Sequence, residues 1–102
     1  MVIFQTKKRI KKKEKEVIHK IVQNWGNVIF SDEKKSTGVN AVFDKNDTNT
    51  WTCYMTVKQG RKKFFKDHAT VGIGENPIKA ALKAIDNFTN AYVIKIGEQM
   101  AS

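Results

Sequence analysis

The sequence predicts an α+β fold, in which a three-stranded antiparallel sheet carries two helices packed on one of its faces. Two amphipathic stretches with helical spacing lie toward the two ends of the chain, and alternating strand patterns lie between them. The expected order of elements is therefore α-β-β-β-α. With 102 residues and one cysteine, the chain is expected to form a single domain, residues 1–102, whose core needs no disulfide.

The first helix is expected over Lys7–Trp25. Apolar residues recur there at spacings of three, four and seven, and they are Ile10, Val17, Ile18, Ile21, Val22 and Trp25. Gly26 is well placed to end this helix as a left-handed C-cap residue. Because lysines in a first turn oppose the helix dipole, a start nearer Ile10 is the alternative. Residues 1–6 are either an edge strand or a hydrophobic staple ahead of the helix.

The middle of the chain predicts three strands in a meander. Val39–Phe43 alternates apolar and polar residues and is interpreted as the first strand, with Val28–Phe30 as a candidate extra strand beside it. The second strand, Thr50–Lys58, is expected to bury one face, formed by Trp51, Cys53, Met55 and Val57. The third is expected over Arg61–Ile73, with a break or bulge near Asp67.

The second helix is expected to begin at Pro77 and to continue to about Gly97. Asn76 suits the N-cap, and proline suits the first helical position, where its missing N–H costs nothing. The apolar stripe of this helix is Ile78, Ala81, Leu82, Ile85, Phe88, Tyr92 and Ile96. An alternative ends the helix near Asn90 and makes Tyr92–Ile96 a strand. We prefer the helix because the apolar period continues past Asn90.

The charge of the chain favours a polyanionic partner. The net charge is +9, and all of the nineteen basic residues except Arg9 and Arg61 are lysine. Lysine suits phosphate groups, whereas arginine suits the paired acceptors of guanine, so backbone contact is expected to outweigh base reading. No apolar stretch is long enough to span a membrane. The single cysteine and the absence of a recognisable export signal point to a cytoplasmic setting.

Two lysine-rich segments and their aromatic neighbours are the expected points of contact. Residues 58–66 hold five basic side chains and no acidic one, and Lys7–Lys15 is the densest run of lysine. Lysines bind phosphates and aromatic rings stack on bases, although such runs also serve simply as solvated faces. The candidate nucleic-acid-binding residues are Lys8, Lys11, Lys12, Lys15, Tyr54, Lys58, Arg61, Lys62, Lys63, Phe64, Lys66, Lys79 and Lys83.

The sequence offers no set of residues for catalysis or metal binding. His19, His68 and Cys53 fall on three different elements, and no pair has the spacing of metal ligands. The acidic residues lack the paired arrangement that acid–base catalysis uses. We therefore expect no metal, no cofactor and no enzymatic activity. Cys53 is expected to be a buried, inert thiol because it shares the apolar face of its strand.

The order of elements resembles that of the double-stranded RNA-binding domain over roughly residues 7–97. The last helix carries small residues, Ala80, Ala81 and Ala84, and follows a hairpin that bears lysines. The resemblance implies an α-β-β-β-α fold that contacts a duplex through its first helix, the loop DKNDTNT, and lysines near the start of its last helix. Residues 50–90 are also similar in pattern to small DNA-binding domains that place a three-stranded sheet in the major groove.

The sequence thus favours a small non-catalytic protein that binds DNA or structured RNA mainly through lysine–phosphate contacts. The alternative is an adaptor or inhibitor, of the kind that phages and other mobile elements encode, whose basic surface docks on an acidic surface of another protein.

Overall fold

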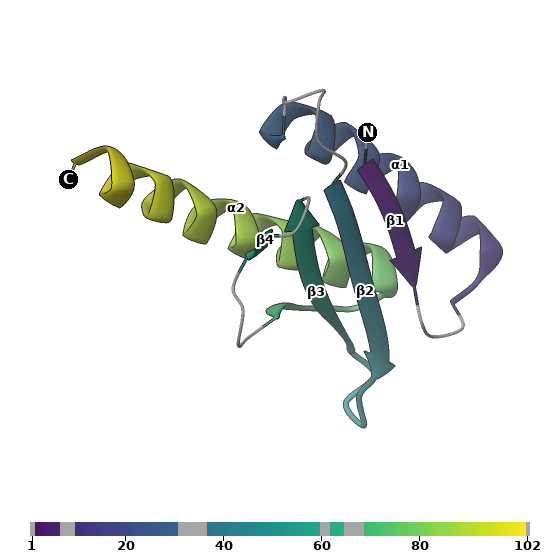
Figure 1. The fold of residues 1–102 in the computed structure, drawn as a ribbon. Coiled ribbons are helices and arrows are strands. Elements are labelled where there is room, and N and C mark those ends of the chain that lie inside the picture. Colours follow the sequence, from purple (N-terminus) through teal and green to yellow (C-terminus); the bar gives the residue numbers. More distant parts are fainter. Residues whose placement is uncertain (1, 7–9, 31–36, 60–61, 65–68, 102) are drawn as a thin grey trace.

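The computed structural model confirms the α+β fold, with two helices in contact with an antiparallel sheet (Figure 1). Figure 1 shows the sheet in front and both helices behind it, so the other face of the sheet is open. Neither described helix is long and apolar enough to cross a membrane. The structure describes the chain over residues 2–6, 10–30, 37–59, 62–64 and 69–101, and its side chains over residues 10–30, 37–59 and 69–94.

The chain forms one sheet and two helices within these ranges. Their bounds are β1 Val2–Thr6, α1 Lys12–Ile29, β2 Thr37–Lys45, β3 Trp51–Gln59, β4 Lys62–Phe64, β5 Thr70–Gly74 and α2 Pro77–Ala101. The strands lie in the order β1, β2, β3, and β4 and β5 both pair with β3. The predicted three-stranded antiparallel sheet is therefore present, with β4 and β5 together in the place of its third strand.

The third strand is interrupted, as the sequence predicts. In β4 Phe64 lies opposite Val57, whereas in β5 Thr70 lies opposite Met55. The pairing therefore moves on by two residues along β3 while the chain advances by six. The predicted position of the break, Asp67, lies outside the described residues, between the end of β4 and the start of β5.

Residues 2–6 form the edge strand that was one of two interpretations of the N-terminus. β1 runs parallel to β2, with Val2 opposite Thr37 and Thr6 opposite Ala41. Parallel neighbours need a long crossover, and α1 provides it. The sheet consequently has one more strand than the sequence predicts.

The bounds of α1 differ from the prediction at both ends. The described helix begins at Lys12, close to the alternative start near Ile10, and it continues through Gly26 to Ile29. The interpretation of Val28–Phe30 as a strand is therefore wrong. The N–H of Phe30 donates to the carbonyl of Gly26 at 2.8 Å, which extends the helix past the glycine.

Aromatic packing explains why Gly26 does not end α1. The ring of Trp25 meets that of Phe30 edge to face at 5.7 Å, and that of Phe88 in α2 at 5.4 Å. The Trp25 indole N–H also donates to the hydroxyl of Thr89 at 2.8 Å. Such contacts hold the last turn of α1 against α2 more strongly than a C-cap preference, which is a local effect, favours ending it.

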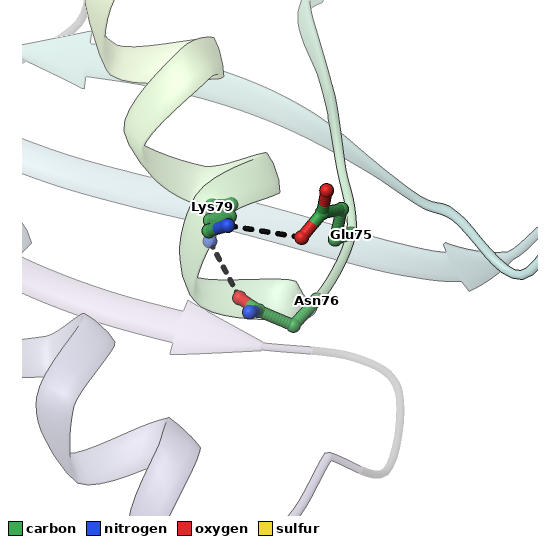
Figure 2. A network of polar contacts seen from close by, with 3 residues as sticks. All are labelled: Glu75, Asn76 and Lys79. Atoms are coloured by element: carbon green, nitrogen blue, oxygen red, sulfur yellow. Dashed lines mark hydrogen bonds and ion pairs between the residues drawn. The ribbon is translucent and has the colours of Figure 1, made fainter.

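The second helix begins as predicted. The N–H of Lys79 donates to the Asn76 side chain at 2.8 Å, and the Lys79 ammonium lies 3.0 Å from the carboxylate of Glu75 (Figure 2). Asn76 is thus the N-cap and Pro77 the first helical residue. The helix continues beyond Gly97, so the preferred interpretation of Tyr92–Ile96 as helix is confirmed.

The buried stripe of α2 is rotated from the predicted one. Leu82, expected at its centre, is 45% exposed, and Val17 in α1 is 41% exposed. The small residues of α2 face the sheet because β5 approaches the helix closely. A Cβ on Gly72 would clash with the backbones of Ala80 and Ala84.

The core lies between the sheet and the two helices. In β3 the predicted face is confirmed, since Cys53, Met55 and Val57 are buried and Trp51 packs against them. The buried apolar residues are Ile18, Val22, Phe30, Val39, Ala41, Phe43, Cys53, Met55, Val57, Ala80, Ala81, Ala84, Ile85 and Phe88.

Candidate nucleic-acid interface

The open face of the sheet carries the residues of β3 that alternate with its buried ones. Tyr54 is 42% exposed and lies near the middle of the strand, and Lys58 is exposed toward its end. Thr56, between them, is half-buried. Two of the predicted contact residues, Tyr54 and Lys58, therefore share one face, four residues apart on a single strand.

Aliphatic side chains flank Tyr54 on both neighbouring strands. Tyr54 lies opposite Val42 of β2 and opposite Val71 of β5. Directly opposite residues of antiparallel strands share a face, so these three side chains form a row across the sheet. Val42 is half-buried, and Val71 is 37% exposed. Ile73, one position further along the same face of β5, is 59% exposed. We call these four residues the open-face patch.

The close approach of α2 puts the aliphatic residues of β5 on the open face. Gly72 faces α2, and a Cβ on Gly74 would lie only 2.6 Å from the backbone nitrogen of Ala80. Since the inward positions admit only glycine, Val71 and Ile73 fall on the outward positions. The sequence prediction did not identify these two residues. The signal for them is the alternation Val-Gly-Ile-Gly directly before a helix with alanines, because small residues on both elements indicate close packing.

A fixed polar turn closes one end of the open face. The amide of Asn46 donates to the hydroxyls of Thr50 at 3.0 Å and Thr52 at 2.8 Å, and Thr52 donates back to the Asn46 carbonyl oxygen. Asn49 has a left-handed φ of 59°, a conformation that asparagine adopts readily. Thr52 is 6% exposed for this reason, although its position in β3 points outward.

The other end of the open face is basic. Lys58 lies opposite Lys63 of β4, and Gln59 lies opposite Lys62. Residues 58–66 contain no acidic side chain to neutralise this end. Phe64 is placed by its pairing with Val57. The predicted contact residues Lys8, Arg61 and Lys66 lie outside the described residues.

The lysines of α2 lie beside the β5 edge of the sheet. Lys79 and Lys83 line a surface hollow that also includes Ile73 of the open-face patch. Acidic residues line it too, and Lys79 pairs with Glu75 at 3.0 Å while both side chains remain largely exposed. The structure therefore brings these lysines near the open face, but it surrounds them with compensating charge.

The lysines of α1 form a separate basic surface. Lys11, Lys12 and Lys15 are exposed in or just before the first turn of α1, within the helix layer behind the sheet (Figure 1). Lys12 and Lys15 line a hollow together with Glu16, His19 and Lys20. The structure thus separates this group from Tyr54 and Lys58, which lie on the opposite, open side.

The described residues contain no arrangement for metal binding or nucleophilic chemistry. Within the described ranges, no group of three or more His, Cys, Asp or Glu residues is close enough to hold a metal ion. Cys53 is fully buried, and its burial raises the pKa of the thiol to about 12. A thiol that stays protonated near neutral pH is a poor nucleophile and a poor metal ligand.

No family model and no curated protein sequence matches this chain. The likeness to the double-stranded RNA-binding domain therefore extends to the α-β-β-β-α order with its three-stranded antiparallel sheet, and not to a shared family.

Proposed function

We propose that this protein binds nucleic acid without catalysing a reaction, mainly through lysine–phosphate contacts to DNA or structured RNA. The observation that carries the proposal is the pairing of Lys58 with Lys63 at one end of an open sheet face that also exposes Tyr54. The chain supplies a net charge of +9, so a polyanion is attracted over the whole surface, and this end of the sheet offers an uncompensated cluster.

The magnitude of the electrostatic effect follows from the number of cations. The five basic residues of 58–66, each on one phosphate, would release enough counterions to give a slope of about −4.5 in log K against log salt on duplex DNA. The α1 lysines lie on another surface, so we expect them to add to this slope only where a long ligand bends around the protein.

The test is a titration of labelled duplex DNA, duplex RNA and single strands at several salt concentrations. Replacing Arg61, Lys62 and Lys63 with alanine should flatten the slope by about two to three units on every sequence, because each removed cation accounts for about 0.9 unit on a duplex. Lys45→Ala is the matched control, since Lys45 is an exposed strand lysine at the far end of β2, opposite Trp51. Binding that is micromolar or weaker to every nucleic acid and unchanged by the triple substitution would refute the proposal.

A second candidate function has one observation in its favour. Val71 and Ile73 expose aliphatic side chains on the same face as Lys58, and exposed apolar groups beside cations also suit a protein surface that is acidic. An adaptor of this kind would bind every nucleic acid weakly, so the same titration separates the two functions.

A further inference from the structure

The open-face patch has a chemistry that differs from the basic end beside it. Of its four side chains, Val42, Val71 and Ile73 are aliphatic, and Tyr54 alone carries a hydrogen-bonding group. The row from Val42 through Tyr54 to Val71 spans two strand spacings, about 10 Å. The patch therefore offers a flat apolar platform with an aromatic ring at its centre.

Such a platform suits the faces of nucleic-acid bases rather than their edges. In a duplex the bases present donor and acceptor edges in the grooves, and matching them takes side chains with several polar groups. Base faces are accessible only where bases are unpaired, and they stack on aromatic side chains. The aliphatic neighbours of Tyr54 pack around a stacked base without leaving polar groups unpaired.

The charges around the patch give the ligand a direction. Lys58 lies four residues beyond Tyr54 on the same face, about 13 Å along the strand. At the opposite end, Asp44 lies across from Thr52, which in turn lies across from Ile73. Phosphates are therefore favoured toward Lys58 and Lys63, and disfavoured toward the turn that contains Asn46.

We infer that the open-face patch binds unpaired nucleotides of a single-stranded nucleic acid, with a base stacked on Tyr54 and the adjoining phosphates at Lys58 and Lys63. This inference rests on the proposed function and narrows it to a ligand class. It assigns the sheet face to stacking and leaves the lysines of α1 free to attract nucleic acid of any form.

The test uses oligomers of about 12 nucleotides, a length within the usual site sizes for single strands. The probes are oligo(dT) and oligo(rU), which separate DNA from RNA as the source, an abasic strand of the same length, and a duplex. We expect Tyr54→Ala to weaken binding to oligo(dT) or oligo(rU) by about 5- to 150-fold, the range for loss of one stacked base. We expect its effect on the duplex to stay within about twofold.

Matched variants keep the result interpretable. Tyr54→Phe retains the ring and should bind within about threefold of the wild type, whereas Tyr54→Thr lacks the ring but keeps a good strand former in case the alanine variant folds poorly. Lys58→Ala should reduce the salt slope on single strands by about 0.7 unit. The abasic strand should bind more weakly than oligo(dT), and equally to the wild type and to Tyr54→Thr.

The outcomes separate this inference from the proposed function. If Tyr54→Thr binds single strands as well as the wild type, or if the abasic strand competes as well as oligo(dT), the stacking inference is overturned while lysine–phosphate binding stands. A substitution at Tyr54 that changes the oligomeric state but not single-strand affinity would assign the patch to a second copy of the chain, and would also overturn the inference. A wild-type protein that binds none of the probes would overturn both.

Discussion

Adding one methyl group at Gly72 should separate β5 from α2. A Cβ at this position would overlap the backbone of Ala80 and would lie 2.8 Å from the Cα of Ala84. Because the obstructing atoms belong to the backbone of a helix, no change of side-chain rotamer can relieve the overlap. The helix must therefore shift away from the sheet, and the buried residues around Phe88 lose contacts when it does.

The expected cost of Gly72→Ala is about 3 kcal/mol or more, at the upper end of what overpacking a core costs. Gly38→Ala is the matched control. Its added Cβ would meet only the carbonyl oxygen of Lys58, at 3.8 Å, which is an ordinary contact. A strand glycine in open space loses stability through its flexibility, so this second substitution should be neutral or stabilising by up to about 1 kcal/mol.

Urea denaturation followed by tryptophan fluorescence measures both effects. With a slope of about 1 to 1.5 kcal/mol per molar urea for a chain of this size, Gly72→Ala should lower the midpoint by about 2 to 3 M. Adding Ala84→Gly should not restore stability, because the obstruction is backbone rather than the Ala84 methyl group. A Gly72→Ala protein within about 0.5 kcal/mol of the wild type would refute the close packing of β5 on α2.

Three further predictions follow from burial and capping. Ile18→Ala should cost about 2–5 kcal/mol because Ile18 is fully buried, whereas Leu82→Ala should cost less than about 1 kcal/mol; equal losses in urea would contradict the observed faces of the helices. Because burial raises the pKa of Cys53 from 9.0 to about 12, the native thiol stays protonated while the unfolded one ionises. Stability should therefore fall as pH rises between these values, and a thiol reagent at pH 9 should label the native chain far more slowly than the unfolded one; equal rates would show that Cys53 is accessible. Asn76→Ala should cost about 0.5–2 kcal/mol in thermal melts, and more than Glu75→Gln, which removes only an exposed ion pair; the reverse order would contradict the assigned cap.

Local patterns were sufficient to predict the elements whose burial follows the strand or helix period. The alternation in β3 places Cys53 and Met55 inward and Tyr54 outward, as the structure confirms. The pair Asn76-Pro77 predicts the start of α2 because capping depends on adjacent residues only. Of the candidate contacts, Tyr54 and Lys58 could be placed on the open face from this period alone.

The remaining features depend on residues far apart in the sequence. Gly26 has the local chemistry of a helix end, but Trp25 and Phe30 pack on α2 and extend the helix through it. Leu82 fits an apolar stripe, yet the close approach of Gly72 turns the alanine face of α2 to the sheet instead. The same approach exposes Val71 and Ile73, so the patch around Tyr54 could not be derived from β3 alone.

The most direct test of the account is a map of the bound surface. Isotope-labelled protein is titrated with a short oligonucleotide, and the backbone amide signals are followed by NMR. The account predicts that the largest shifts occur on the open face, at Tyr54, Thr56, Lys58 and Val71, with smaller ones at Lys12 and Lys15. Shifts concentrated on α1, with the β3 signals unmoved, would contradict the assignment of the nucleic-acid interface to the open face of the sheet.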